Sequence, residues 1–135
     1  MLDILLNKRA DLCPVRFCRN PRSPKKHHKG GVCSKCSMRE WRASNPIKAA
    51  FSHLRQNAKY RRKEFALTFE EFADWCERTH YIELRGREAA CAQIDRIDYR
   101  RGYSLDNIQL LSCSENSSKG NRERYAMQGV EADPF

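Results

Sequence analysis

Residues 91–121, CAQIDRIDYRRGYSLDNIQLLSCSENSSKGN, contain the pattern that decides the fold of this 135-residue chain. The pattern predicts a short strand over residues 93–98 and a second strand over residues 107–111. Gly102 marks a loop between the two strands. Ser112 begins the S-x-x-E pattern of a capping box, which predicts that a helix starts there. The predicted order is therefore strand, loop, strand, helix.

This order of elements resembles the ββα-metal site of HNH endonucleases, in particular the phage and mobile-element variants written around "DRID…GY…N". The resemblance rests on Ile94-Asp95-Arg96-Ile97-Asp98, Gly102-Tyr103, Asn107-Ile108-Gln109-Leu110-Leu111, and Asn116 with Lys119-Gly120. It covers residues 93–121. It implies an α+β fold in which a small zinc knuckle and several helices are packed on the ββα-metal motif.

The resemblance implies a role for each matching residue. Asp95 corresponds to the acidic ligand of a catalytic divalent ion, Mg²⁺ or Mn²⁺, and Asn116 corresponds to the second protein ligand of that ion. Asn107 corresponds to the central asparagine, whose side chain holds the loop between the strands. Lys119 is expected to hold a neighbouring phosphate. Oxygen ligands such as Asp and Asn suit a hard cation that polarises a scissile phosphate.

One position departs from the family pattern. The family has a histidine directly after the first-strand aspartate, where it acts as the general base, whereas this chain has Arg96. Arginine stays protonated and cannot be a base, so Arg96 is expected to clamp a phosphate oxygen or to offset transition-state charge. Loss of a general base lowers the rate by roughly 10²–10⁴. His80 is a candidate substitute, and attack without any protein base is the other route.

Simpler interpretations of the same residues remain open at this point. Asn107 can end a turn, and Asn116 can be a polar residue at the start of a helix. Asp98 is expected to form a turn. Many relatives staple the two strands to the final helix with zinc-binding cysteine pairs, but the matching positions here are Ser112 and Glu115. That staple is therefore absent from the sequence.

A cysteine-rich segment precedes this motif. Residues 13–36 read CPVRFCRNPRSPKKHHKGGVCSKC, and the spacings from Cys13 to Cys18 and from Cys33 to Cys36 are short. Two such thiolate pairs complete the tetrahedral site that structural zinc prefers, and a segment without apolar periodicity needs a metal to fold. We predict that these four cysteines bind a structural Zn²⁺. The alternative is four free, partly buried thiols.

The remaining histidines and cysteines of interest are expected to have no ligand role. His27 and His28 lie among lysines and are expected to be solvated side chains. Cys76, Cys91 and Cys113 have no partner at ligand spacing and are expected to be small core residues. Seven cysteines, an odd number, together with no apparent export signal favour a reducing compartment.

Two helices are predicted between the cysteines and the ββα motif. Asn45 before Pro46 is an N-cap with proline at the first helical position, and Thr68 begins a second capping box with Glu71. The apolar face of the first helix comprises Ile47, Ala50, Phe51, Leu54 and Ala58. Its other faces are basic, which indicates either a solvated surface or a helix that follows nucleic-acid phosphates. The candidate nucleic-acid contacts are Lys48, Arg55, Lys59, Arg61, Arg62 and Lys119.

These features divide the chain into four segments. Residues 1–43 are the zinc-binding segment, residues 44–90 the basic helical region, and residues 91–124 the ββα motif. Residues 125–135 are expected to be a partly disordered tail or a short strap, with Tyr125 packed on the fold. Within the helical region, residues 79–90 are expected to be an irregular or short-strand connection.

The charge of the chain is unevenly distributed. Lys and Arg number 26 against 17 Asp and Glu, for a formal net charge of +9. Residues 1–66 carry 17 basic and 4 acidic side chains, whereas residues 67–135 carry 9 basic and 13 acidic ones. Such a basic half suggests a nucleic acid or another anionic surface as the partner. Coiled-coil, collagen, repeat and disordered classes do not fit the pattern.

The sequence also leads to an expected location and function. It has no apolar run long enough to span a membrane and no typical signal peptide, so we expect no membrane partner and a cytoplasmic location, that of the bacterial host if the gene is phage-encoded. The sequence sets no oligomeric state. The leading hypothesis is an HNH-type endonuclease that hydrolyses or nicks DNA phosphodiesters while the basic half holds the DNA backbone. The alternative, motivated by Arg96, is a catalytically weak or inactive HNH-like nucleic-acid-binding or adaptor protein.

Overall fold

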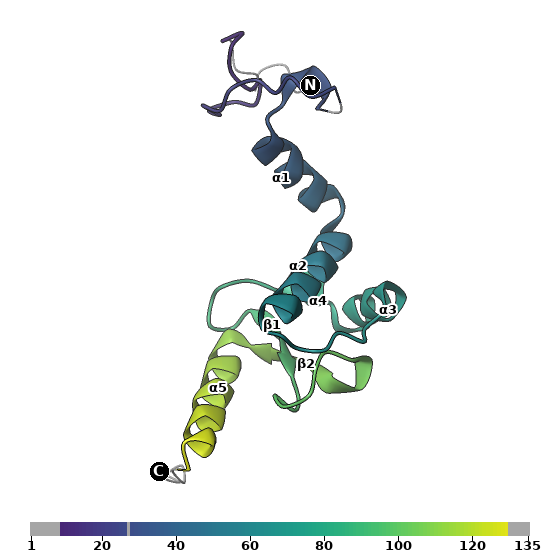
Figure 1. Ribbon diagram of the computed structural model, residues 1–135, viewed down its shortest axis with the longest axis vertical. Coiled ribbons are helices and arrows are strands. Elements are labelled where there is room, and N and C mark those ends of the chain that lie inside the picture. The colour runs from purple at the N-terminus through teal and green to yellow at the C-terminus, as the bar shows by residue number, and fades with distance from the viewer. Residues whose placement is uncertain (1–8, 27, 130–135) are drawn as a thin grey trace. The chain divides into compact units, whose positions relative to one another are not determined.

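The computed structural model describes residues 9–26 and 28–129, and the chain divides into two units, residues 1–46 and 47–135. Figure 1 labels the helices and strands along the chain. The second unit contains all of the predicted ββα motif and most of the predicted basic helical region. No helix among the described residues is long and apolar enough to cross a bilayer.

The first unit consists of a folded loop followed by one helix. A bridge between Leu12 and Pro21 closes the loop around the first cysteine pair. A short 3-10 turn, η2 (Lys29–Gly31), leads to α1 (Ser34–Ser44), a helix that the sequence analysis did not anticipate. The buried residues at the centre of this unit are all cysteines, namely Cys13, Cys33 and Cys36. The first unit therefore has little apolar surface with which to stabilise itself.

The helices of the second unit begin where the sequence predicts. The helix α2 (Pro46–Tyr60) starts at the predicted proline, and its predicted apolar residues all belong to the core or pack against it. The helix α3 (Phe69–Thr79) starts after Thr68, whose hydroxyl accepts the Glu71 N–H at 3.2 Å while the Glu71 carboxylate accepts the Thr68 N–H at 2.9 Å. The predicted capping box is therefore confirmed.

Aromatic rings form much of the core of the second unit. Phe72 is fully buried, and its ring stacks on that of Trp75 with the centroids 6.1 Å apart. The ring of Phe51 meets the rings of Phe65 and Phe69 edge-on, each at 5.5 Å. Offset and edge-on pairs of this kind contribute about 0.5–1.5 kcal/mol each beyond the area they bury. The core thus joins α2, α3 and the segment between them.

The sheet has two antiparallel strands, β1 (Ala92–Arg96) and β2 (Ile108–Ser112), and Asp95 lies opposite Gln109. The first strand ends two residues earlier than predicted because Asp98 forms a turn, in which its carboxylate accepts the Arg100 N–H at 3.0 Å. The second strand begins one residue later because Asn107 belongs to the 3-10 turn η3 (Leu105–Asn107). The predicted pair of strands is confirmed, with these shifted ends.

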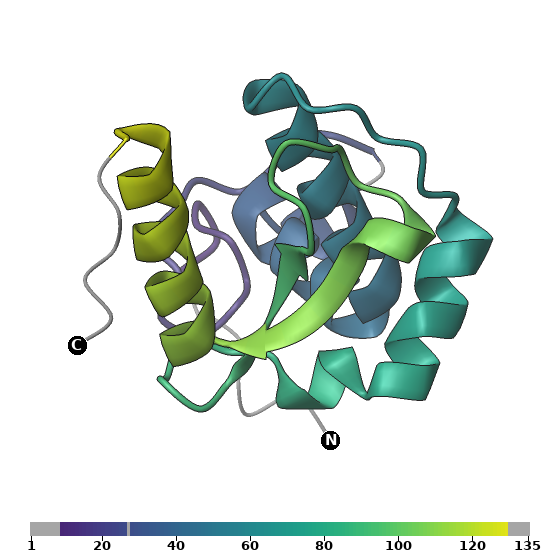
Figure 2. The ribbon, with the colours of Figure 1, turned by 90° about the horizontal axis from the view of Figure 1, so that it is seen from below.

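The final helix, α5 (Cys113–Met127), follows β2 directly, as Figure 2 shows. The predicted capping box is present, since the Ser112 hydroxyl accepts the Glu115 N–H at 3.1 Å and the Glu115 carboxylate accepts the Ser112 N–H at 2.9 Å. The helix continues beyond the predicted end of the motif to Met127, and Gly129 adopts a left-handed φ just after it. Tyr125 is 53% exposed, so the expectation that it packs on the fold is wrong.

The connection between α3 and β1 is more regular than expected. Residues of the predicted irregular segment form a short helix, α4 (Tyr81–Leu84), and a bridge pairs Arg85 with Ala92. Cys76 is buried in the core as predicted, whereas Cys91 and Cys113 are only half-buried.

Candidate functional site

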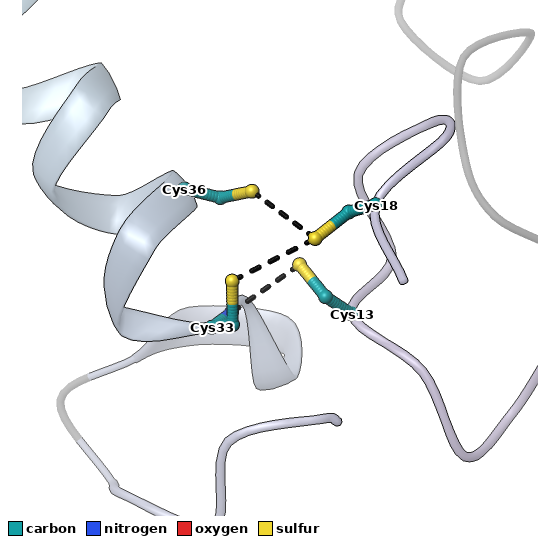
Figure 3. Close-up of side chains that lie close together, drawn as sticks. All are labelled: Cys13, Cys18, Cys33 and Cys36. Atoms are coloured by element: carbon teal, nitrogen blue, oxygen red, sulfur yellow. Dashed lines mark hydrogen bonds between the residues drawn. The ribbon is translucent and has the colours of Figure 1, made fainter. Parts of the chain in front are cut away.

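Four cysteine side chains converge in the first unit, and Figure 3 shows them pointing toward one another. All four sulfur atoms lie within 4.8 Å of one another. The Sγ of Cys18 is 3.8 Å from that of Cys33 and 3.6 Å from that of Cys36. A tetrahedral zinc ion with Zn–S bonds of about 2.3 Å holds its sulfurs about 3.8 Å apart. The cluster therefore has the size and chemistry to hold a tetrahedral metal ion.

The backbone around the first pair explains why these two sulfurs meet. The Cys13 N–H donates to the carbonyl of Asn20 at 2.9 Å, and the Cys18 N–H donates to the carbonyl of Val15 at 3.0 Å. Phe17 has a φ of 62°, in the left-handed region, which reverses the chain immediately before Cys18. These contacts fold residues 13–20 into a knuckle with both thiols on its inner side.

The second pair lies at the start of α1, where Cys33 is the N-cap residue and Cys36 lies in the first turn. The Cys36 amide and the Asn20 side chain lower the pKa of Cys33 to about 6, whereas burial raises the pKa of Cys36 to about 12. Neighbouring thiolates repel one another, so all four thiols ionise together only around a cation. A metal ion would supply the positive charge that such a cluster requires.

Two polar residues that the sequence analysis did not identify surround the cluster. The side-chain amide of Asn20 lies 3.4 Å from the Cys33 sulfur, and the guanidinium of Arg39 lies 3.4 Å from the Cys36 sulfur. Hydrogen bonds of this kind orient ligand sulfurs and stabilise their negative charge. His28 is not part of the cluster, because its Nδ1 lies 2.6 Å from the Ser23 hydroxyl. His27 lies outside the described residues.

A second group of polar side chains lies between the sheet and α5. Alternation along β1 places Gln93 and Asp95 on the same face, and Gln109 lies opposite Asp95 on β2. The helix contacts this face, because the Asn116 side-chain amide donates to the Gln93 oxygen at 2.8 Å and Lys119 Nζ lies 2.7 Å from Asp95 Oδ2. We call these five side chains the polar layer. The sequence analysis did not identify Gln93 and Gln109. Strand alternation and the register between the strands are the signals that could have found them.

Asp95 is the most constrained member of the polar layer. Its Oδ2 accepts from Gln109 Nε2 at 3.0 Å as well as from Lys119, and the side chains of Asp95 and Lys119 are only 13% and 16% exposed. Lys119 Nζ also lies 3.1 Å from Glu123 and donates to the Arg96 carbonyl. Desolvation lowers the pKa of Lys119, but the two carboxylates more than offset it, so the net pKa is raised. The lysine predicted to hold a phosphate is thus bound to carboxylates of its own chain.

The donor atoms of the polar layer suit a divalent cation. Asn116 uses its NH₂ group on Gln93, which leaves its amide oxygen as an acceptor. The ammonium of Lys119 shows that the surroundings of Asp95 Oδ2 accommodate a positive charge. Oxygen atoms from one carboxylate and one amide are ligands that Mg²⁺ and Mn²⁺ accept. Within residues 9–26 and 28–129, no hydrogen bond joins Asp95 directly to Asn116, although α5 and β1 are in contact.

Asn107 holds the loop that joins the two strands. Its side-chain oxygen accepts the Asp98 N–H at 2.8 Å, and its NH₂ group donates to the carbonyls of Asp98 and Gly102 at 3.1 and 2.7 Å. The residue is 1% exposed, so these bonds are shielded from water. This is the loop-holding contact that the resemblance implies for Asn107.

The structure places Arg96 away from the polar layer. Because successive strand residues face opposite sides, Arg96 lies on the other face of β1 from Asp95. Its Nη1 donates to the carbonyls of Tyr99 and Arg101 at 2.7 and 2.8 Å, and its guanidinium lies 5.4 Å from the centre of the Tyr103 ring. The guanidinium therefore stabilises the loop, in place of the expected phosphate clamp.

The remaining predicted site residues lie at exposed positions. His80 forms the junction between α3 and α4 with a left-handed φ of 55°, and the hydrogen bonds found among the described residues do not link its ring to the polar layer. The predicted nucleic-acid contacts in and after α2 are all exposed: Lys48, Arg55, Lys59, Arg61 and Arg62.

Comparison with known proteins gives this chain no relative. No family model matches it, and neither the curated proteins nor the solved structures contain a significant match. Its function must therefore be inferred from its own residues.

Proposed function

We propose that this protein is a metal-dependent endonuclease of the HNH type that cleaves DNA phosphodiesters. The observation that supports this most is the polar layer, in which the mostly buried carboxylate of Asp95 lies between a two-stranded sheet and the helix that follows it. A buried carboxylate is unfavourable unless a cation or hydrogen bonds compensate it. A mostly buried carboxylate that faces a specific charge partner is a candidate for a functional site.

In this proposal Asp95 and Asn116 are the protein ligands of a divalent ion, Mg²⁺ or Mn²⁺. When bound, that ion polarises the scissile phosphate and stabilises the leaving oxygen. Gln109 orients the Asp95 carboxylate and Gln93 orients the Asn116 amide, so the two ligands are held before any ion arrives. Asn107 fixes the loop that follows the first ligand.

Lys119 takes a second role in the same proposal. Two cations on Asp95 Oδ2 would repel each other, so Lys119 would leave that oxygen if Asp95 held a divalent ion. Glu123, 3.1 Å from Lys119 Nζ, keeps the ammonium close by. From there Lys119 would be able to donate to a phosphate oxygen, which is the role that the resemblance implies for it.

The four-cysteine cluster is proposed to hold a structural Zn²⁺. Four thiolates and a closed tetrahedral arrangement are typical of structural rather than catalytic zinc, because no position remains for water or substrate. The exposed basic side chains of α2 are proposed to contact the DNA backbone, where phosphate contacts supply most of the affinity.

The test of the nuclease is cleavage of supercoiled plasmid by the full-length protein with Mn²⁺ or Mg²⁺. We expect nicked or linear product from the parent protein, and a loss of at least about a hundredfold for Asp95→Asn, which removes the charge and keeps the shape. Asp74→Asn removes an exposed carboxylate on α3 and is the matched control. Parent-level cleavage by Asp95→Asn would contradict the proposal, as would a parent protein that cleaves neither strand.

A second candidate is a nucleic-acid-binding protein that retains the ββα scaffold without turnover. It is favoured by Arg96, which binds the loop at the position where the HNH pattern that the chain resembles has a histidine base. A missing base lowers the rate by roughly 10²–10⁴. This candidate predicts salt-sensitive DNA binding that Asp95→Asn leaves intact, with no cleavage of plasmid by any variant.

A further inference from the structure

A cavity of about 520 Å³ lies between the end of α2 and the loop that joins β1 to β2. Residues 62–64 and 66 line one side, and residues 100–104 and 106 line the other. Four of the lining side chains are cationic and two are acidic: Arg62, Lys63, Arg100 and Arg101, with Glu64 and Asp106. Of these cations the sequence analysis selected only Arg62, and the fold brings Arg100 and Arg101 to it from the other end of β1.

The two walls of the cavity are joined by backbone contacts. The Tyr103 N–H donates to the carbonyl of Glu64 at 2.8 Å, and the Ala66 N–H donates to the carbonyl of Tyr103 at 2.9 Å. Gly102 passes so close that a Cβ atom there would lie 2.2 Å from the Glu64 oxygen. Only glycine permits this approach. The cationic side chains therefore extend from a backbone that is already fixed, which favours binding of a ligand.

The cations of the cavity are unequally paired. Arg101 lies 2.9 Å from Asp106, and Arg100 lies 3.3 Å from Asp98. By contrast, neither Arg62 nor Lys63 forms an ion pair with another of the described residues. The wall next to α2 thus carries the positive charge that is not neutralised within the protein.

Arg62 occupies a backbone position that glycine normally takes. The Lys63 N–H donates to the Ala58 carbonyl at 2.8 Å and the Arg62 N–H donates to the Lys59 carbonyl at 3.1 Å, which is the Schellman arrangement at the end of a helix. Arg62 has the left-handed φ of 55° that this arrangement needs, a conformation that is unfavourable for a residue with a Cβ. An arginine at this position suggests that its side chain has a use that offsets the backbone strain.

We propose that this cavity binds a backbone phosphate of the duplex DNA substrate. Guanidinium groups bind phosphate oxygens with a planar fork of donors, and the cavity is large enough for a phosphodiester with its sugar. The loop that carries Arg100 and Arg101 begins directly after β1, the strand that carries Asp95. This inference rests on the proposed function and names a substrate contact for it.

The test measures binding of the full-length protein to a short labelled DNA duplex over a range of salt concentrations. We expect Arg62→Gly to weaken binding about three- to tenfold and to reduce the slope of log Kd against log salt by about one. We expect its Tm to be no lower than that of the parent, because glycine suits the left-handed position. Arg78→Gln, an equal loss of charge on an exposed side chain of α3, is the matched control and leaves the slope unchanged.

Two further variants separate this proposal from the proposed nuclease. Lys63→Gln and Arg100→Gln are each expected to weaken duplex binding and to reduce the salt slope, whereas Asp95→Asn is expected to lower cleavage at least about a hundredfold and to retain the salt slope. A parent-like slope for Arg62→Gly and Lys63→Gln overturns the phosphate site even if the parent protein cleaves DNA. Cavity-dependent binding without cleavage supports the site and contradicts only the nuclease. Binding to RNA but not to duplex DNA overturns the site as proposed.

Discussion

The two units of this protein are stabilised by different means. In the first unit the buried residues are cysteines whose sulfurs converge on one point. In the second unit they include Phe72, Trp75 and the apolar face of α2, which pack without any ligand. The difference predicts that the first unit needs a bound metal to fold, whereas the second unit folds by burying apolar side chains.

The largest expected effect is loss of the first unit on removal of metal. Structural zinc in small domains contributes about 10–16 kcal/mol of apparent binding free energy, which is folding free energy. We therefore expect that a strong chelator, or Cys36→Ser, shifts the NMR signals of residues 9–46 to the chemical shifts of an unfolded chain. The signals of residues 47–129 are expected to stay at their folded positions. Metal analysis of the parent is expected to give one zinc per chain.

Cys113→Ser is the control for this experiment, because Cys113 is half-buried and lies outside the cluster. It is expected to keep the zinc and both sets of signals. If the first unit stays folded in chelator, its stability does not come from a metal and the contrast between the units disappears.

The next largest effect concerns the second unit. Phe72 has no exposed surface, so Phe72→Ala is expected to lower the free energy of unfolding by about 3–5 kcal/mol through lost burial and the cavity left behind. Urea unfolding followed by tryptophan fluorescence measures this change. Phe17→Ala removes an 84% exposed ring in the first unit and is expected to change stability by less than about 0.5 kcal/mol. Equal effects of the two substitutions would contradict the described core.

A smaller effect is expected at the loop between the strands. Asn107→Ala removes three hydrogen bonds that are shielded from water, and leaving such groups unsatisfied costs about 1–3 kcal/mol. Compared with the parent, the variant is expected to exchange its Asp98 amide hydrogen faster, with a smaller change at the amides of α2. Asn121→Ala, at an exposed position of α5, serves as the control. Unchanged protection at Asp98 would show that the loop is held by other contacts.

The smallest effects are expected at the helix starts. Ser112→Ala and Thr68→Ala each remove a hydroxyl from a capping box and are expected to lower stability by about 1 kcal/mol. The helix of the first unit offers a contrast, since Cys33 caps α1 without a side-chain hydrogen bond to its backbone. Calorimetry of the two substitutions tests whether the second unit relies on local caps as well as on its core.

The Ser112 cap also has a pH dependence. Hydrogen bonds from the Ser112 backbone and side chain lower the pKa of Glu115 from its ordinary value of 4.5. A carboxyl group with a lowered pKa stabilises the folded state fully above its unfolded pKa, and this contribution is lost as the pH falls through the folded value. The difference between the parent and Glu115→Gln should therefore be largest above pH 4.5 and shrink in more acidic solution.

Local features of this fold were predictable from the sequence, whereas contacts between residues far apart in the sequence were not. Short-range signals predicted the capping boxes at Thr68 and Ser112, and both are present. The predicted apolar face of α2 packs in the core, and the cysteines with short spacing come together in one cluster. The helix α1 was missed because residues 34–44 have only two large apolar side chains.

The composition of the polar layer depends on register and packing. The sequence suggests Asp95 and Asn116, but not that Gln109 lies opposite Asp95 or that Lys119 reaches it from α5. The position of Arg96 on the opposite face follows only once β1 is known to be a regular strand. Likewise, the cavity beside Arg62 forms only when the loop after β1 meets the chain after α2.

The ladder between β1 and β2 makes this hairpin sensitive to a change in length. Inserting one residue before Asp95 would turn its carboxylate toward the aromatic core and turn an apolar neighbour toward α5, since side chains alternate between faces. Substitutions at single positions leave that alternation intact, but insertions and deletions of an odd number reverse it. Homologous chains that share this site should therefore vary in the identity of their strand residues while keeping the spacing from Asp95 to the loop held by Asn107.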